Sequence, residues 1–185
     1  GPDPFGKKMT EIMTAAGINA SNLLTQRIDW ATHVYIKPYI GEKELSRIDF
    51  GNFNSLQNET ADDLISCLKR SLSEIDIVII NQQVPSGIHT PYFRESLISL
   101  IKENPGKTFI VDSRNFSDEF EGALRKINDI EASRLCGIIR DPSDSVPDRE
   151  MVKIAEELYR RYKQALFITR GSKGSLTIDD KGISH

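Results

Sequence analysis

The stretches IDIVIINQQ (residues 75–83) and KTFIVDSRN (residues 107–115) decide the fold that we expect for this chain of 185 residues. Each is a short apolar run that ends in polar residues, which is typical of a strand buried on both faces of a sheet. Ile79 and Ile110 lie 31 residues apart, and residues 91–103 between them have the pattern of a helix, so the three segments fit one βαβ unit. The sequence therefore predicts an α/β fold, with a mainly parallel sheet flanked by helices on both faces.

The alternation of helix and strand continues on both sides of this unit. Before it, apolar residues at helical spacing predict a helix with Thr60 as its N-cap. After it, we expect helices over residues 128–135 and 147–163, a buried strand over 166–169, and two strands over 175–178 and 182–185 that are joined by a turn at Asp179-Asp180-Lys181-Gly182.

The N-terminal third follows a different pattern. Met9, Ile12 and Met13 predict a short amphipathic helix that stops at Gly17. Residues 32–50 are rich in β-branched and aromatic residues around Gly41-Glu42-Lys43, which predicts a β-hairpin that stands apart from the rest. Pro38 confines the first strand of that hairpin to an edge or bulged position.

Composition excludes several functional classes. Apolar residues make up 38% and charged residues 28% of the chain, and the net charge is −3, with no basic stretch that would indicate nucleic-acid binding. No apolar run approaches the ~20 residues that a membrane-spanning helix needs. Two cysteines are too few for a disulfide scaffold and favour a reducing, cytoplasmic location.

Polar residues follow each of the expected buried strands. Residues 81–83 (NQQ), 112–115 (DSRN) and 169–171 (TRG) all occupy such positions. In open α/β sheets ligands bind in the crevice beyond the carboxyl ends of the strands, so these clusters predict a site for a polar, phosphate-bearing ligand. The alternative is that strand ends are simply exposed and their turns polar.

Two further motifs carry candidate chemistry. Asn128 and Glu131 share one face at the start of a helix, where a carboxylate can hold a hydrated Mg²⁺. The same spacing matches a capping box equally well. Gly171 and Gly174 follow a strand and let the backbone come close to a ligand, although a hairpin turn explains them about as well.

The order of these motifs resembles the ribokinase-like family of carbohydrate kinases, often called the PfkB family. Residues 1–6 (GPDPFG) look like the family's G-x-D-x-x-G turn, and residues 16–18 (AGI) look like its helix end. The hairpin at 32–50 resembles the family's lid over the sugar. Asn128-x-x-Glu131 matches its N-x-x-E motif, and Thr169-x-Gly171-x-x-Gly174 matches its nucleotide loop. The heptose-phosphate kinase branch is the most similar, because residues 45–49 (LSRID) and 111–114 (VDSR) echo its lid and strand-end motifs.

The resemblance implies transfer of the γ-phosphoryl group of ATP to a sugar hydroxyl, with Mg²⁺ as a cofactor and a small sugar or sugar phosphate as substrate. It assigns Mg²⁺ to Asn128 and Glu131. Arg114 is assigned a phosphate contact. Nucleotide binding falls to Thr169, Gly171 and Gly174, and substrate binding to Arg47, Asp49 and Gln83, although a solvent-facing cross-strand pair explains Arg47 and Asp49 about equally well.

The resemblance also implies what this chain lacks. The family's catalytic base belongs to a G-A-G-D motif that we expect beyond His185, and the family's first sugar-binding residues are expected before Gly1, so residues 1–185 are interpreted as the central part of one kinase domain that is inactive by itself. Family members often pair through their lids, which implies a homodimer. Gln82 and Gln83 stand where the heptose-kinase branch has an acid, which favours an alternative function as a non-catalytic sugar- or nucleotide-binding regulator. A third hypothesis is a kinase for a nucleoside or vitamin alcohol, which differs from the sugar-kinase hypothesis only in its substrate.

Overall fold

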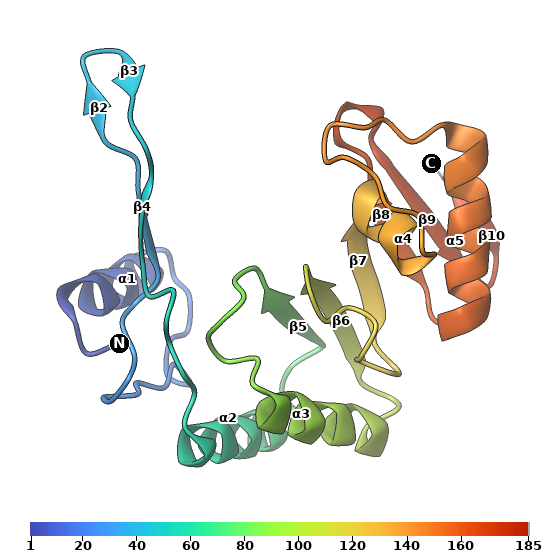
Figure 1. The fold of residues 1–185 in the computed structure, drawn as a ribbon. Helices are drawn as coiled ribbons and strands as arrows, with labels where there is room; N and C mark the ends of the chain where they lie inside the picture. Colours follow the sequence, from blue (N-terminus) through green and yellow to red (C-terminus); the bar gives the residue numbers. More distant parts are fainter. Residues whose placement is uncertain (185) are drawn as a thin grey trace. The chain divides into compact units, whose positions relative to one another are not determined.

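The computed structural model describes residues 1–184, and the chain divides into two compact units. The first unit consists of Gly1–Ser71 and Val84–Ser96, and the second consists of Leu72–Gln83 and Leu97–His185. Figure 1 shows the elements in chain order. His185, the last residue of the expected final strand, lies outside the described residues.

The first unit carries the hairpin that the sequence predicts. Its helices are α1 (Pro4–Ala15) and α2 (Asn58–Ser71), and its antiparallel pairs are β1 (Val34–Ile36) with β4 (Ile48–Phe50) and β2 (Tyr39–Ile40) with β3 (Lys43–Glu44). The hairpin over residues 32–50 is thus confirmed, as two short ladders in place of one. Pro38 lies between the ladders and has no N–H to donate, although its carbonyl accepts a hydrogen bond from Leu45.

The start of α1 is fixed by a single carboxylate. Asp3 caps the helix by accepting the N–H of Gly6 at 2.9 Å, and its other oxygen accepts the N–H and the hydroxyl of Thr32 at 2.9 and 3.0 Å. Burial by itself raises the pKa of Asp3, but the hydrogen bonds from Thr32 and Gly6 outweigh burial and lower the pKa from 3.8 to about 2. The carboxylate therefore ties α1 to the strand region that follows it.

The depressed pKa of Asp3 predicts an acid-sensitive first unit. Because the folded state binds the proton less tightly than the unfolded state, the carboxylate stabilises the fold above pH 4 and this stabilisation is lost as the pH falls through about 2. We expect Asp3→Asn to lower stability by about 1 kcal/mol at neutral pH and to flatten this pH dependence, whereas the exposed Asp63→Asn changes neither. Urea unfolding followed by the fluorescence of Trp30, the single tryptophan, measures both effects, and an Asp3→Asn protein that still loses stability between pH 4 and pH 2 contradicts this assignment.

The second unit is a six-stranded sheet in the order β10-β9-β8-β7-β6-β5. Strands β5 to β8 are parallel, and β9 and β10 are antiparallel additions at one edge. The strands are β5 (Ile77–Gln82), β6 (Thr108–Ser113), β7 (Leu124–Asn128), β8 (Leu166–Thr169), β9 (Ser175–Asp179) and β10 (Gly182–Ser184), and the helices between them are α3 (Pro91–Glu103), α4 (Asp129–Leu135) and α5 (Asp148–Tyr162). The mainly parallel α/β sheet is confirmed.

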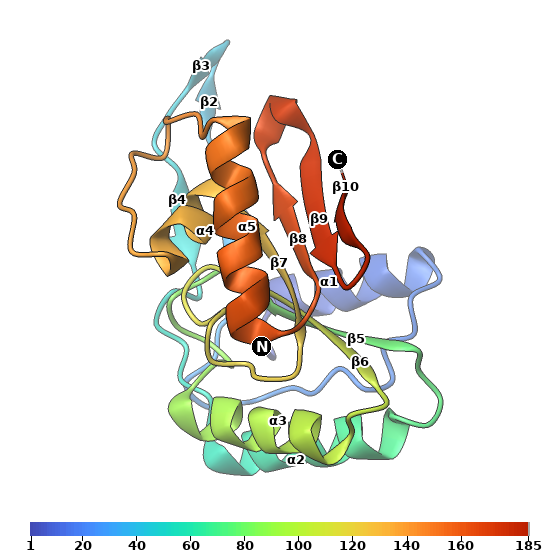
Figure 2. The same ribbon diagram turned by 90° about the vertical axis from the view of Figure 1, so that its right-hand side faces the viewer.

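Alternate residues of the sheet have opposite environments. On one face, residues from β7, β8 and β9 form a core with α4 and α5, and Figure 2 shows α5 lying across that face. On the opposite face, Ile77 and Ile79 of β5 are 51% and 70% exposed, and Phe167 of β8 is 36% exposed. The expected covering helices are therefore present on the first face, while the opposite face keeps its apolar residues exposed.

Two details differ from the sequence expectations. Helix α2 begins at Asn58, so the prediction of Thr60 as its N-cap is wrong, and Thr60 lies in the first turn. Strand β7 was not predicted, because Arg125 and Lys126 interrupt its apolar pattern. Arg125 is nevertheless 1% exposed, since its guanidinium donates to three backbone carbonyls inside the fold.

Candidate functional site

The candidate site is the rim formed by the carboxyl ends of the parallel strands. Arg114 follows β6, Asn128 ends β7 and Thr169 ends β8, and these three strands are neighbours in the sheet. Asn128 and Thr169 are directly paired in the β7–β8 ladder. Arg134 of α4 donates to the carbonyl of Arg114, which connects the helix after β7 to the loop after β6. The structure thus brings together at one rim the residues that the sequence assigns to metal, nucleotide and phosphate.

Asn128 and Glu131 form a reciprocal capping box. The side chain of Asn128 accepts the N–H of Glu131 at 2.8 Å, and one carboxylate oxygen of Glu131 accepts the N–H of Asn128 at 2.9 Å. The capping alternative is therefore present in the fold. The capping contact engages one carboxylate oxygen, so the half-buried Glu131 can still accept through its second oxygen.

A chain of polar side chains runs across the ends of β5, β6 and β7. Arg114 donates through Nε to the side-chain oxygen Oε1 of Gln83 at 2.9 Å, and the side-chain nitrogen Nε2 of Gln83 donates to a carboxylate oxygen of Asp112 at 3.3 Å. Asp112 in turn pairs with Lys126 of β7 at 3.0 Å. These contacts fix the Arg114 guanidinium at the rim while leaving its terminal nitrogens exposed for an anion.

Gln82 is a buried residue that stabilises the loop after β6. It is 1% exposed, and its side-chain oxygen accepts the hydroxyl of Ser113 and the N–H of Asn115 at 2.9 and 3.0 Å. Its amide nitrogen donates to the side chain of Asn115 at 3.1 Å. Of the NQQ cluster, Asn81 and Gln83 are therefore exposed, and the buried Gln82 connects β5 to the loop after β6.

The loop after β8 has the backbone conformation that its glycines permit. Gly171 and Gly174 have φ values of 57° and 78°, and a Cβ at either position would meet nothing within 4 Å, so backbone conformation and not crowding requires glycine. The N–H of Arg170 donates to the carbonyl of Gly174 at 2.9 Å, which closes the loop. The space beside both glycines is open.

Arg47 and Asp49 belong to the first unit, whereas the rim residues belong to the second. They form a bidentate ion pair at 2.6 and 2.8 Å, and the Arg47 guanidinium lies 4.7 Å from the centre of the Tyr35 ring. Asp49 raises the pKa of Arg47 through this hydrogen-bonded pair. For these residues the sequence left open the alternative of a solvent-facing cross-strand pair. The observed ion pair joins two residues that are two apart in the chain, and not residues on two facing strands.

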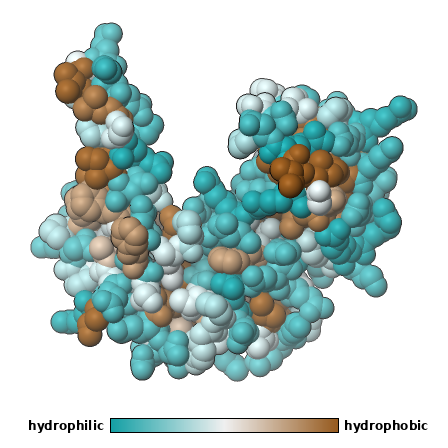
Figure 3. All heavy atoms as spheres, in the orientation of Figure 1, coloured by the Kyte–Doolittle hydropathy of each residue, from teal (hydrophilic) through white to brown (hydrophobic). Residues whose placement is uncertain are grey.

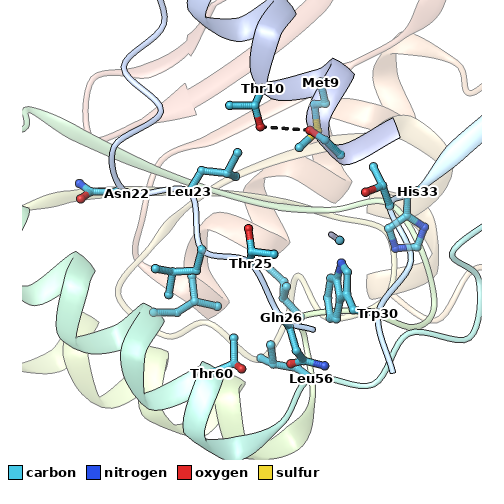
Figure 4. Close-up of a pocket in the computed structure, with 16 residues that line it drawn as sticks. Met9, Thr10, Asn22, Leu23, Thr25, Gln26, Trp30, His33, Leu56 and Thr60 are labelled. Carbon is cyan, nitrogen blue, oxygen red and sulfur yellow. Dashed lines mark hydrogen bonds between the residues drawn. The ribbon is translucent and has the colours of Figure 1, made fainter. Parts of the chain in front are cut away.

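The first unit also contains a cavity that sequence patterns did not indicate. It has a volume of about 340 Å³ and is lined by residues of α1, the following loop and α2, as Figure 4 shows. Trp30 and His33 line it, and burial lowers the pKa of His33. None of the predicted site residues lines this cavity. The loop between α1 and β1 has no helical or strand periodicity, so the sequence carries no signal for it.

The fold is ribokinase-like, and the solved structures similar to it include sugar kinases. A putative sugar kinase from Clostridium perfringens matches at 17% identity over 97% of this chain and 54% of its own (TM-score 0.67). Ribokinase from Thermotoga maritima matches at 18% identity over 100% and 56% (TM-score 0.65), and 2-dehydro-3-deoxygluconokinase from the same organism at 14% over 98% and 61% (TM-score 0.69).

The comparisons establish the fold and leave the branch open. No family model and no curated protein sequence matches this chain. The chain spans only a little over half the length of the similar kinases, with shares of 54%, 56% and 61%. A nucleoside kinase from Burkholderia thailandensis in complex with inosine is also similar (17% identity over 96% of this chain and 53% of its own, TM-score 0.54), so the structures that share this fold are not all named as sugar kinases. No helix among residues 1–184 is long and apolar enough to cross a membrane.

Proposed function

We propose that this chain is the central part of an ATP-dependent sugar kinase. The observation that carries the proposal is the convergence of Arg114, Asn128 and Thr169 at one rim of a ribokinase-like sheet. Each of these residues offers a cation, an amide or a hydroxyl at a strand end, where parallel sheets bind their ligands. The cytoplasmic location expected from the cysteine content belongs to the same proposal.

The residues at the rim suit a nucleotide and its metal. Among the described residues no three His, Cys, Asp or Glu side chains cluster as metal ligands, so Mg²⁺ would be held by Glu131 and Asn128 with water and phosphate oxygens completing its shell. Such an ion neutralises phosphate charge during phosphoryl transfer. Thr169, Gly171 and Gly174 would contact the nucleotide, and Arg114 would bind a phosphate oxygen. Gln83 donates and accepts hydrogen bonds and suits a sugar hydroxyl.

The open face of the sheet supports the interpretation that further parts of the domain lie outside residues 1–185. A parallel sheet is normally buried on both faces, yet Ile77, Ile79 and Phe167 on this face are 51%, 70% and 36% exposed. We propose that helices from the rest of the kinase domain cover these residues. The base and anion-binding loop that the resemblance assigns beyond His185 would belong to the same missing part.

The lid residues support pairing of two subunits in the full-length protein. Tyr39 and Ile40 at the hairpin tip are 56% and 71% exposed, and Ile48 and Phe50 nearer its base are 50% and 43% exposed. Figure 3 shows brown, hydrophobic patches along the hairpin. We propose that this hairpin, residues 32–50, forms the contact between the two subunits, since contiguous exposed apolar surface marks interaction sites.

Phosphotransfer assays on the full-length protein test the proposed function. Heptose phosphates, ribose, fructose and nucleosides are offered with ATP, and we expect turnover of a sugar or sugar phosphate. The 185-residue chain alone is expected to transfer no phosphate, because electrostatic stabilisation of the transferring group needs the missing anion site. Binding of a sugar or nucleotide by the full-length protein without turnover of any acceptor would favour the regulator instead, for which Gln83 in place of an acid is the supporting observation.

A further inference from the structure

A second group of cations lies on the other side of the loop after β8. Arg149, Arg170 and Lys173 line a hollow of about 560 Å³ together with Asp148 and Val152. Figure 2 shows the start of α5 and the loop after β8 side by side, and these are the elements that supply the lining residues. Three cations face one carboxylate, so the hollow carries a net positive charge. None of the residues proposed above for the nucleotide or the metal lines it: Asn128, Glu131, Thr169, Gly171 and Gly174.

Arg170 is the buried element of this hollow. Its side chain is 3% exposed, and Nη2 donates to the carbonyl of Val146 at 2.9 Å and to Asp148 at 2.7 Å. Its Nε is buried and has no hydrogen-bond partner. A buried donor without an acceptor is rare in folded proteins, and an oxygen of a bound anion in the hollow would supply one.

The surroundings of Arg170 add further positive groups to the hollow. Lys173 is held at the hollow because its ammonium donates to the carbonyl of Val146 at 3.1 Å. Arg149 makes no ion pair among residues 1–184, and its side chain is exposed. Helix α5 has 15 residues and begins at this point after Pro147, which supplies no capping side chain, so its first-turn N–H groups add to the positive potential.

We propose that this hollow binds a phosphoryl group, with Arg170 as its buried anchor and Arg149 and Lys173 as its outer ligands. Guanidinium and ammonium groups bind phosphate through charge-assisted hydrogen bonds, which are stronger than neutral ones. The hollow uses other side chains than those proposed for phosphotransfer and needs no metal, although Arg170 and Lys173 belong to the same loop as Thr169, Gly171 and Gly174. Free phosphate and the phosphate of a small metabolite share this chemistry.

Titration of the 185-residue chain with inorganic phosphate, at constant ionic strength and followed by amide chemical shifts, tests the proposal. We expect saturable shifts confined to the start of α5 and the loop after β8. Parallel titrations with ribose 5-phosphate and AMP identify the source of the phosphoryl group. If either compound binds more tightly than inorganic phosphate, the site is assigned to a metabolite. If they bind with the same affinity as inorganic phosphate, it is assigned to free phosphate.

The variant Arg149→Ala/Lys173→Ala removes both outer cations and leaves the buried contacts of Arg170 in place. We expect it to bind phosphate at least about tenfold more weakly. The matched control Arg160→Ala/Lys181→Ala changes the net charge equally at exposed positions away from the hollow, and is expected to bind as the parent does. Absence of saturable binding, or equal weakening by both double variants, overturns the proposal, and neither result depends on phosphotransfer.

Discussion

Replacing Arg125 by alanine is expected to lower the free energy of unfolding of the second unit by about 4 kcal/mol. The guanidinium is buried, and it donates to the carbonyls of Ser117, Phe120 and Ala123 at 2.8, 3.0 and 3.0 Å. It also lies 3.7 Å from the centre of the Tyr162 ring. Alanine removes the guanidinium donor from all three carbonyls and opens a cavity beside the ring. The carbonyl of Phe120 still accepts the N–H of Ala123 at 3.3 Å, whereas each carbonyl that loses its donor costs about 1–3 kcal/mol.

Urea unfolding followed by far-ultraviolet circular dichroism measures this loss. Arg125→Met keeps most of the side-chain volume but none of the donors, so we expect it to lose about 3 kcal/mol, which separates the hydrogen bonds from the cavity. Arg160→Ala, at an exposed position on α5, serves as the control and is expected to change stability by less than about 0.5 kcal/mol. A loss below about 1 kcal/mol for Arg125→Ala would show that the carbonyls find other donors.

Arg125 also explains why β7 was not predicted from the sequence. Burial lowers the pKa of its guanidinium, which shows that its charge is disfavoured inside the fold, and charged residues are normally read as exposed. Its partners are carbonyls of the loop that precedes it, and no periodic pattern reports such local contacts. Strands β5, β6 and β8 were predicted because their apolar runs are continuous, although alternate residues of β5 and β8 are exposed within residues 1–184.

The residues of the rim could be predicted once the strands that form it had been predicted. Once the parallel strands are placed, Arg114 and Thr169 must lie at one edge, because parallel strands end on the same side. The detailed contacts were not predictable. Gln82 and Gln83 are neighbouring residues of the same type, yet the alternation of side chains along the strand buries Gln82 and exposes Gln83. For Arg47 and Asp49 the sequence left a cross-strand pair open as an alternative, and the two residues do pair with each other, but as neighbours two apart in the chain, a contact that side-chain rotamers decide.

The spacing of Asn128 and Glu131 fits both a helix cap and a metal site, and one substitution separates the two roles. Glutamine at the third helical position retains the capping box, so Glu131→Gln is expected to change stability by less than about 0.5 kcal/mol. It removes the negative charge that would hold Mg²⁺. In the full-length protein we therefore expect phosphotransfer to fall by about 100-fold and the Mg²⁺ concentration at half-maximal rate to rise.

Glu131→Ala provides the matched comparison, because it removes the cap and the charge together. We expect Glu131→Ala to lose about 1 kcal/mol of stability. We also expect its phosphotransfer activity to fall as far as that of Glu131→Gln. Thermal unfolding and Mg²⁺ titrations of the initial rate, carried out on both variants, supply the two readouts. If Glu131→Gln keeps full activity and an unchanged Mg²⁺ requirement while Glu131→Ala loses stability, the carboxylate serves the helix alone. Another carboxylate would then have to hold the metal. Within the described residues the rim offers Asp129 at the start of α4, whose carboxylate accepts the N–H of Ile130, and Asp112 of β6, which pairs with Lys126.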